Sequence, residues 1–567
     1  MSTAKRNIQK ICNDSKDGSV LYEFGGEGYK SSVRHFLESS TDVAAYAVQP
    51  GSETTLVEIM KVIAKEKVPF AVKGGGHAMC PGFSSTTGAQ ISMMRFKQVK
   101  YDEKAKTLDV GAGCLWDEVY REVAKFKRNV VGGASADGVG VAGWLLGGGY
   151  SLKTNKYGLG IDNVLKYRIV LPNGRIRTAT KDDKDTKDLY QALRGGGNNF
   201  GIVTQFTLKT HPQTATFGAS LSFPGTREDR VKAAIVKFVK EESRPEAAIV
   251  SAFRHTLRNG KREYNISVLC VFDAPRPSRR ADIPFRMFAD LMKGSASFTS
   301  NPVGWNARGA TTTLETLPDA DVQNAGPEDG SDLEESGFRE MTADEMHDII
   351  SPYDLEPRVP FQVVSDPDID SAIEENASFA VSPSTLTARG ASRGGLTAMK
   401  GVGELAARGR FHCIMVSKYT KKLIDAVARE AEAAAQSLKA KNGQMVLIDI
   451  WPFLPSIFDN SPRGAAWPHK KGAAFGPLLA YFRWEKAEDD KFWLRKMKTA
   501  LKNIEKVALE EGCTTGKLPY YSNTSLEDVT ARMIYRDNLK SLQKVRAKYD
   551  PDDVMGNTGG YKIPLPK

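Results

Sequence analysis

Apolar residues recur along this chain with the spacings of helices and strands. Residues 53–66 carry apolar side chains three and four positions apart, which predicts a helix. Residues 68–72 form a short apolar run, which predicts a buried strand. The two patterns together predict a helix–strand unit.

The same kind of pattern predicts further elements up to about residue 212. We expect strands around a turn in 101–111, an amphipathic helix over 116–126, a hairpin over 165–178, a short helix over 188–193 and a strand over 202–208.

The pattern changes near Pro212. From there to about Pro519, helices and strands mix with fewer glycine clusters. Residues 311–345 are acidic and poor in apolar side chains, which predicts a disordered or extended insertion. Near the C-terminus, residues 531–549 are predicted to form a helix.

The predicted strand at 68–72 leads into three consecutive glycines, residues 74–76, followed by His77 and a Pro81-Gly82 turn. Glycines allow positive φ and a close approach of a ligand to the backbone. Their amides can form a nest for an anion such as a pyrophosphate. Residues 83–89 have no helical period, so this is not the strand–glycine–helix unit of a nicotinamide-binding enzyme.

A second glycine-rich stretch covers residues 132–150. It is not enriched in proline or serine, so it does not have the composition of a flexible linker. Valines and leucines between the glycines indicate a buried backbone that lies against something flat.

Composition narrows the class of protein. The net charge is +11, but acidic residues are interspersed along the chain, which favours a solvated basic surface over a nucleic-acid interface. The six cysteines are far apart and form no CxxC pair, so we expect neither a zinc site nor a disulfide framework, and no other metal site is expected.

Two further observations concern location. The N-terminus is polar and shows no apolar signal-peptide core, and no stretch approaches the ~20 apolar residues of a membrane span. The expectation is a soluble cytoplasmic protein without a membrane partner.

Several motifs occur together in one order. They are Gly74–His77, Gly138–Val141, Gly147–Tyr150, Lys156–Leu159 with Asp162 and Asn163, Gly197–Val203, and near the C-terminus Tyr549–Pro551 with Val554–Gly556. In this combination the chain closely resembles the berberine-bridge-enzyme-like flavoprotein oxidases of the vanillyl-alcohol-oxidase superfamily, and in particular their fungal members.

The resemblance implies an α+β protein with a PCMH-type, two-subdomain FAD-binding domain over residues 40–212. Residues 213–517 would form a substrate domain, an antiparallel sheet covered by helices. Residues 518–567 would complete the FAD domain.

FAD is the cofactor that the resemblance implies, and it also implies the residues that contact FAD. These are Lys73, Gly74, Gly75, Gly76, His77, Ala78, Gly82, Gly138, Val139, Gly140, Val141, Gly143, Gly148, Asp162, Asn163, Gly201, Ile202 and Val203. Val139 matches the family position that influences the access of oxygen to the flavin.

In the family, the histidine that matches His77 is bonded to the 8α-methyl carbon of the flavin. Many relatives have a second link through a cysteine, but this chain has Ala136 at that position. We therefore expect one covalent bond, through His77, and no cysteinyl link. Cys80 is expected to be a packed side chain.

Hydride loss from carbon requires removal of a proton from the attached O–H or N–H group. The family segment that supplies a base resembles residues 467–481, but no glutamate or lysine stands at the expected offset. Tyr150 and Tyr521 match tyrosines that face the flavin, so we expect them to act as a base and its partner, with Tyr520 as the neighbouring candidate. The alternative is that they line the pocket. His469 either orients a substrate or is structural.

The function expected from the resemblance is that of an FAD-dependent oxidase. A sugar, alcohol or secondary metabolite would lose hydride to flavin N5, and O2 would reoxidise the flavin to give H2O2. The alternatives are a flavin dehydrogenase with another acceptor and a catalytically impaired flavin-binding homologue. The expected partners are a small-molecule substrate and O2, and the expected state is a monomer.

Overall fold

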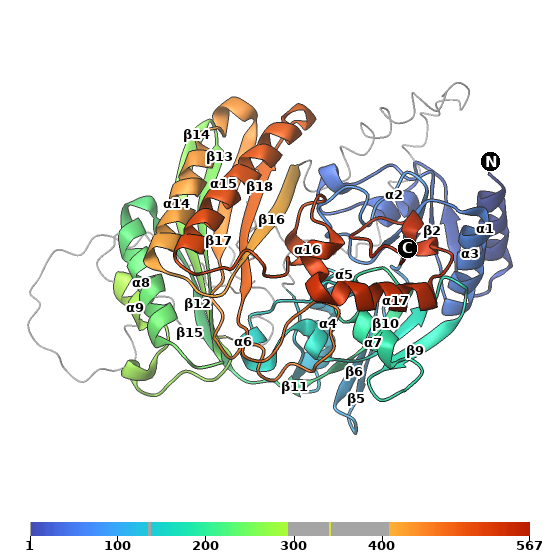
Figure 1. The fold of residues 1–567 in the computed structure, drawn as a ribbon, viewed down its shortest axis with the longest axis horizontal. Helices are drawn as coiled ribbons and strands as arrows, with labels where there is room; N and C mark the ends of the chain where they lie inside the picture. The colour runs from blue at the N-terminus through green and yellow to red at the C-terminus, as the bar shows by residue number, and fades with distance from the viewer. Residues whose placement is uncertain (1, 134–137, 293–338, 342–406, 567) are drawn as a thin grey trace, which may run out of the picture.

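The computed structural model describes residues 2–133, 138–292, 339–341 and 407–566. The expected insertion at 311–345 lies outside these ranges except for β15 (Arg339–Met341). Two large hydrophobic cores organise the described chain, one in the N-terminal half with the C-terminal segment and one beneath a single large sheet (Figure 1).

The first sheet has the order β1-β2-β4-β3. Its strands are β1 (Val20–Tyr22), β2 (Tyr46–Gln49), β4 (Ala89–Ser92) and β3 (Phe70–Lys73). Strands β2 and β3 run parallel to β4. The predicted helix is confirmed as α3 (Glu53–Glu66), which begins where Ser52 accepts a hydrogen bond from the amide of Thr55. Helix α1 (Thr3–Asp14) packs on α3, so this unit includes residues in front of residue 40.

The second sheet is antiparallel, with the order β5-β6-β10-β8-β9. Its strands are β5 (Val99–Asp102), β6 (Thr107–Gly111), β10 (Ile202–Lys209), β8 (Val164–Val170) and β9 (Ile176–Thr180). The predicted hairpin and strands are therefore confirmed. The two predicted helices are α4 (Trp116–Ala124) and α7 (Lys187–Leu193). Strand β7 (Arg128–Asn129) pairs with β11 (His211–Pro212).

The third sheet has seven antiparallel strands in the order β15-β12-β14-β13-β17-β18-β16. Besides β15 they are β12 (Thr216–Pro224), β13 (Ala247–Arg258), β14 (Lys261–Phe272), β16 (Arg408–Val416), β17 (Gly443–Ile450) and β18 (Gly476–Trp484). On one face, Ile448 and Ala480 belong to the core beneath the helices. On the other face, Leu447 and Tyr481 belong to the core of the N-terminal half, as the period of two along a strand requires.

Four helices cover the outer face of this sheet: α8 (Glu228–Glu241), α9 (Arg286–Met292), α14 (Lys421–Ala435) and α15 (Asp490–Glu510) (Figure 1). The expected antiparallel sheet covered by helices is therefore confirmed. The opposite face of the sheet packs against the N-terminal half.

The helix predicted over 531–549 is interrupted. It consists of α16 (Ala531–Tyr535), a turn at 536–538 and α17 (Leu539–Tyr549). The interruption falls at Arg536, whose φ of 48° is incompatible with a right-handed helix. Apolar period alone does not reveal such a break. Helix α17 then packs on α7, which joins the C-terminal segment to the N-terminal half (Figure 1).

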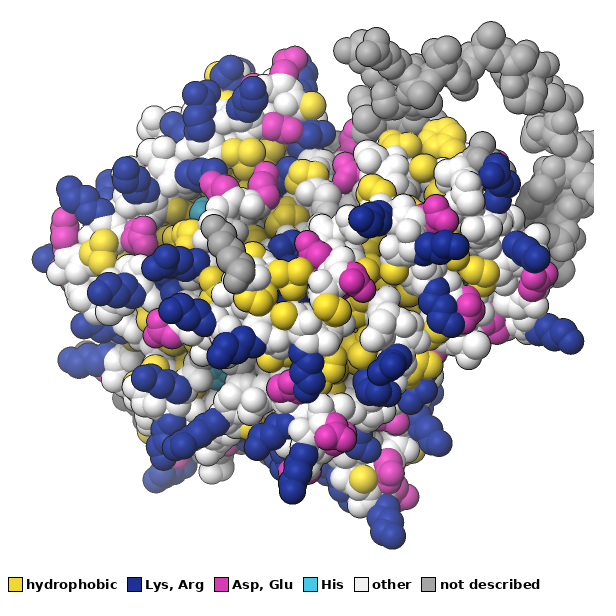
Figure 2. All heavy atoms as spheres, turned by 45° about the vertical axis from the view of Figure 1, so that its right-hand side comes forward, with side chains coloured by type: hydrophobic (Ala, Val, Ile, Leu, Met, Phe, Trp, Pro, Cys, Tyr) yellow, Lys and Arg dark blue, Asp and Glu magenta, His cyan; other side chains and the backbone are white. Residues whose placement is uncertain are grey.

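On the face that Figure 2 shows, lysines and arginines are scattered with acidic side chains between them, rather than collected in one stripe. Within the described ranges, no helix combines the length and the apolar character that crossing a bilayer requires.

Candidate functional site

The glycine triplet forms one side of a tight contact between two loops. It follows β3, and Gly75 lies directly against Gly140 from the second glycine-rich stretch. A Cβ added to Gly75 would lie 2.5 Å from the Cα of Gly140, and one added to Gly140 would lie 2.4 Å from the nitrogen of Gly75. No side chain fits at either position. The contact therefore explains both glycines and joins the two motifs in space.

The amides of the triplet are available to a ligand. Gly76 has a φ of 81°, a conformation that turns the backbone direction within the triplet. Within the described part of the chain, the amides of Gly74, Gly75 and Gly76 donate no backbone hydrogen bond. Because buried or half-buried amides are normally paired, three such neighbours suit an anion such as a pyrophosphate.

Gly140 precedes a short helix, α5 (Val141–Leu146). This glycine cluster therefore opens a helix, and the amide of Val141 donates to the carbonyl of Cys114. The preceding strand, β7, is paired antiparallel, so the parallel βαβ unit of a nicotinamide site is still not formed. A Cβ on Gly143 would meet nothing within 4 Å, which leaves room for a ligand beside α5. Gly138 has a φ of 68° and one neighbouring atom at 3.9 Å.

Lys73 lies beneath the triplet. Its side chain is 5% exposed, and its Nζ donates to the carbonyl of Ser31 at 3.1 Å. A Cβ on Gly76 would lie 2.8 Å from the Cε of Lys73. Burial, followed by the charges of Arg34 and Lys97, lowers the pKa of Lys73 to about 8. A buried cation beside an anion nest is suited to a phosphate ligand.

His77 and Ala78 are half-buried and follow the triplet directly. The His77 ring stacks on Phe36, with the ring centroids 4.4 Å apart and the planes 17° from parallel. The amide of Phe36 donates to the carbonyl of Gly76, so the stacking partner is fixed to the triplet itself. The orientation of His77 is therefore set by the loop that carries the nest.

Cys80 is buried, and its thiol lies 3.5 Å from the carbonyl of Ser525. Burial raises the pKa of this thiol, which disfavours the reactive thiolate. These features match the packed role expected for Cys80. Ala136 lies outside the described residues.

Local backbone contacts fix the remaining residues that were expected to contact FAD, at Gly82, at Gly201 and at the start of β10. The Gly82 amide donates to Asp42 at 3.0 Å, which fixes the turn after the nest. Gly201 has a φ of 143°, and a Cβ there would lie 2.4 Å from the carbonyl of Val170. Ile202 and Val203 are buried at the start of β10 and pair with β8.

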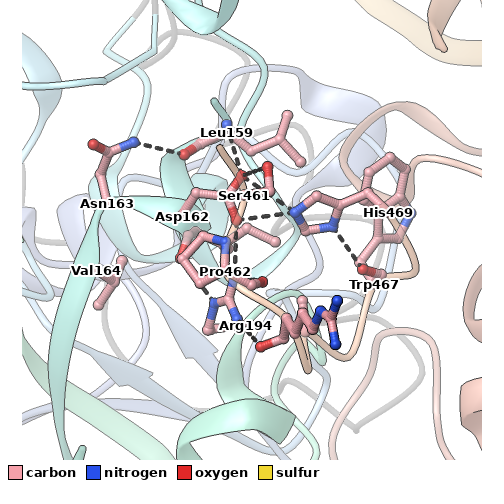
Figure 3. A network of polar contacts seen from close by, with 12 residues as sticks. Leu159, Asp162, Asn163, Val164, Arg194, Ser461, Pro462, Trp467 and His469 are labelled. Atoms are coloured by element: carbon pink, nitrogen blue, oxygen red, sulfur yellow. Dashed lines mark hydrogen bonds and ion pairs between the residues drawn. The ribbon is translucent and has the colours of Figure 1, made fainter. Parts of the chain in front are cut away.

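Asp162 and Asn163 use their side chains on protein partners. The Asn163 amide donates to the carbonyls of Tyr157 and Leu159, and its oxygen lies 2.9 Å from Nε2 of His211. Asp162 belongs to a buried network with Arg194 and His469 (Figure 3). The side chains of both residues are thus held by protein partners.

Tyr150 and Tyr521 are brought together as expected. Both are buried, at 3% and 4% exposed, and their ring centroids lie 5.1 Å apart, edge to face. The Tyr150 hydroxyl donates to the carbonyl of Phe475 at 2.7 Å. The Tyr521 oxygen accepts from the amides of Gly149 and Tyr150, both at 3.2 Å, and from the side chain of Asn523 at 2.9 Å.

None of the three candidate tyrosines has the lowered pKa that would favour a tyrosinate at neutral pH. Burial raises the pKa of Tyr521 to about 12, against three hydrogen bonds that act to lower it. Burial, followed by the negative charges near it, raises the pKa of Tyr150 well above its usual value. Tyr520 is half-buried, and burial raises its pKa to about 12. Both buried hydroxyls are therefore protonated at neutral pH, and Tyr521 has the better environment for a transient anion.

Gly148 lies close to Tyr150 in the chain. Its φ is 129°, and a Cβ there would lie 3.2 Å from the Tyr521 ring. Val139 lies within the same glycine-rich stretch, residues 132–150, and its carbonyl accepts a hydrogen bond from the amide of Trp116 at 3.1 Å.

Aromatic residues that sequence reasoning did not single out surround Tyr150. The ring centroids of Phe453, Trp467 and Trp451 lie 5.0, 5.9 and 6.4 Å from that of Tyr150. Phe475 packs on Trp467 at 5.5 Å. Their only sequence signal is the density of aromatic residues between 451 and 475, which is equally typical of a core.

The structural residues Arg194 and Ser461 were also missed by sequence reasoning. Arg194 is a charged side chain that is fully buried, and nothing in its neighbourhood along the chain predicts its partners, which come from residues 161–162 and 462–463.

With this geometry in place, comparison with known proteins defines the class. Residues 44–180 match the FAD binding domain family. The fold of the whole chain is that of the berberine-bridge-enzyme-like flavoproteins. It superposes on the Physcomitrella patens BBE-like 1 protein with a TM-score of 0.67 and 17% identity, covering 100% of both chains. It superposes equally well, with a TM-score of 0.67 and 15% identity over 100% of both chains, on a xylooligosaccharide oxidase from Myceliophthora thermophila. Residues 44–180 thus match an FAD binding domain, and the chain shares the fold of these BBE-like proteins.

Curated relatives match over shorter stretches. The FAD-dependent monooxygenase FUP4 of Fusarium proliferatum is 46% identical over 157 residues, 28% of this chain and 30% of that protein. An uncharacterized FAD-linked oxidoreductase of Arthroderma benhamiae is 36% identical over 276 residues, 48% of this chain and 52% of that protein. The matches thus span about a third to a half of the length of these relatives.

The residues present fit FAD. The triplet amides, which donate to no carbonyl within the described ranges, and the buried Lys73 suit a diphosphate. Gly143 leaves the space beside α5 open. The residues that would hold the cofactor are therefore those of the triplet, His77, and the segment from Gly138 to Gly143.

Proposed function

We propose that this protein is an FAD-dependent oxidase that removes hydride from a small organic substrate, a sugar, an alcohol or a secondary metabolite. The observation that carries the proposal is the contact between Gly75 and Gly140, which places the second glycine-rich stretch against an anion nest that a half-buried histidine follows directly. In this proposal the substrate binds beside the aromatic cluster around Tyr150 and Tyr521. When bound, FAD supplies the two-electron acceptor.

The residues of the pocket have distinct parts in this proposal. Trp467, Phe453 and Trp451 exclude water and present flat apolar surfaces to the substrate. The base in this proposal is the phenolate form of Tyr521, the small fraction that has lost its proton, and three donors that face its oxygen stabilise that anion. Tyr150 orients this site through its hydrogen bond to the carbonyl of Phe475.

We further propose a covalent bond between His77 and the flavin. The stack on Phe36 fixes the ring beside the nest, as such a bond requires. The test is to denature the purified protein and ask whether yellow flavin stays with the polypeptide. Wild type should retain it and His77→Ala should lose it. His211→Gln, a change of a buried histidine that stacks on Tyr157, is the matched control and should retain it. Release of flavin from denatured wild type would refute the bond.

The relatives motivate a second candidate, because several are named FAD-dependent monooxygenases. Oxygen use separates the activities once a substrate is found by anaerobic bleaching of the flavin. An oxidase forms one H2O2 for each O2 consumed. A monooxygenase places oxygen in the product. A dehydrogenase reduces its flavin fully but consumes no O2, and a colourless protein that takes up no FAD would indicate an impaired homologue.

The oligomeric state of the protein, its location and its partners are also proposals. We infer a monomer in the cytoplasm that binds neither nucleic acid nor membranes. Light scattering on the purified holoprotein tests whether it is a monomer, and a mass twice that of the chain would contradict this.

A further inference from the structure

A buried cluster of charges lies next to Trp467 and joins two distant parts of the chain (Figure 3). Asp162 comes from the turn after α6 (Thr154–Tyr157), and Arg194 follows α7. His469 and Ser461 come from the loop between β17 and β18. The side chains of Arg194 and His469 are 0% exposed, and that of Asp162 is 3% exposed.

Both oxygens of Asp162 are engaged. One accepts from Arg194 at 2.7 Å and lies 2.9 Å from Nε2 of His469. The other accepts from the hydroxyl of Ser461 at 2.6 Å and from the amide of Leu159 at 3.1 Å. Burial acts to raise the pKa of Asp162, but the charges and hydrogen bonds of His469 and Arg194 outweigh it and lower that pKa. The carboxylate is therefore ionised.

The partners of His469 determine its protonation. Its Nε2 faces the Asp162 carboxylate, and its Nδ1 lies 2.9 Å from the carbonyl of Trp467. Both partners can only accept, so both ring nitrogens donate. The imidazole is thus held as a cation between the two.

Arg194 fixes the same loop at other points. Its Nη1 and Nη2 donate to the carbonyls of Arg463 at 3.1 Å and Pro462 at 3.0 Å, and its Nε donates to Ile161 at 3.1 Å. A guanidinium with this many buried partners holds them in one geometry. The cluster therefore attaches the loop of residues 461–469 to the FAD-binding half.

This loop carries part of the aromatic cluster around Tyr150 and Tyr521. Trp467, whose carbonyl His469 holds, packs on Tyr150 and Tyr521 with ring centroids 5.9 and 6.1 Å apart. Phe475, which accepts from Tyr150, lies farther along the same connection. A shift of the loop would move Trp467 relative to both tyrosines.

We infer that Asp162 is a positioning residue: together with Arg194 and the His469 cation, it sets the position of Trp467 against Tyr150 and Tyr521. The functional meaning of this inference rests on the proposed oxidase pocket. The position of Trp467 itself can be measured without any substrate.

The experiment labels the holoprotein with 5-fluorotryptophan and follows the 19F resonance of Trp467, assigned by its absence in Trp467→Phe. In Asp162→Asn the resonance should shift or split into more than one line. His469→Gln is the milder variant, because glutamine keeps one donor but no cation, and it should shift the same resonance. An unmoved Trp467 resonance in a folded variant of either kind would overturn the inference.

The matched control is Asp273→Asn. Asp273 is another buried carboxylate, 3% exposed, which pairs with Lys153 across the same two halves of the chain. It contacts none of the cluster residues, so this change should lower stability while leaving the Trp467 resonance in place. If Asp273→Asn moves the resonance as far as Asp162→Asn does, the effect is a general loosening and the inference fails.

A second measurement separates this inference from the proposed function. With selective 15N-histidine labelling, the His469 ring should show two protonated nitrogens in wild type, and a single protonated nitrogen would overturn the assignment of the cation. Wild-type protein that takes up no FAD would refute the proposed oxidase, while the 19F and 15N results would still decide whether the cluster positions Trp467.

Discussion

Replacement of Lys73 by methionine should make the apoprotein more stable and its affinity for FAD weaker. Lys73 is 5% exposed, and its pKa is lowered from 10.5 to about 8. That difference corresponds to roughly 3 kcal/mol, the cost of keeping the ammonium group buried. Methionine keeps the length of the side chain and removes the charge.

The sign of the pH dependence follows from the lowered pKa. Below pH 8, lysine is protonated in both the folded and the unfolded state, and the full cost is present. The cost decreases as pH rises from 8 to 10.5, because the folded state loses its proton first. Apoprotein with Lys73 should therefore gain stability across this range, and Lys73→Met should show no such gain. The hydrogen bond to the Ser31 carbonyl reduces the net gain of the variant below roughly 3 kcal/mol.

Bound FAD should have the opposite effect on the charged form of Lys73. A bound diphosphate favours the charged lysine, so binding takes up a proton near pH 8 to 10. If the ligand restores the pKa of Lys73 fully, affinity falls by at most roughly 300-fold as pH rises through this range.

The assay is a titration with FAD, followed by quenching of flavin fluorescence, at pH 7 and at pH 10 in a His77→Ala background that keeps FAD exchangeable. Thermal unfolding of the apoprotein is followed in parallel. Lys61→Met is the control, because Lys61 is an exposed lysine paired with Glu58 at 2.7 Å. Equal FAD affinity for Lys73→Met and its parent at pH 7 would refute the role of Lys73, whatever the change in stability.

Three further outcomes are expected. Gly75→Ala should weaken FAD binding at least about tenfold in the same titration, because its Cβ would lie 2.5 Å from the backbone of Gly140; binding equal to the parent's would contradict the cradle. Tyr521→Phe should lower the free energy of unfolding in urea by about 1–3 kcal/mol, more than Tyr150→Phe, because it leaves three donors without their acceptor rather than one carbonyl without its donor; the reverse order would contradict the hydrogen-bond assignment. If Tyr521 accepts the substrate proton, turnover should rise about tenfold per pH unit between pH 7 and 10, since its pKa is about 12, and a rate independent of pH would exclude it as the base.

Much of the N-terminal half could be predicted from sequence because its determinants are local. Helix α3 has the predicted bounds, since Ser52 caps it and its apolar residues recur with helical spacing. The β8–β9 hairpin follows from alternation and a turn. The importance of the glycine triplet was also visible, because three adjacent glycines are costly unless the backbone needs them.

The residues that these local features contact depend on the tertiary structure. Gly75 requires glycine because Gly140 lies against it, a contact between residues 65 positions apart that no period reveals. The break of the C-terminal helix at Arg536 is likewise invisible in its apolar pattern. The site therefore combines local motifs whose spatial relation depends on packing.

The residue types of the site can be read directly from the chain: a nest of glycines, a histidine beside it, and two tyrosines without a carboxylate base. The chemistry of these groups depends on where folding places them. Burial raised the pKa of both tyrosines, since a phenolate is poorly solvated inside a protein. Asp162 became one member of a buried charge cluster because folding placed Arg194 and His469 within hydrogen-bonding distance. Desolvation and long-range contacts have no counterpart in the linear chain, and they set the protonation state of each group.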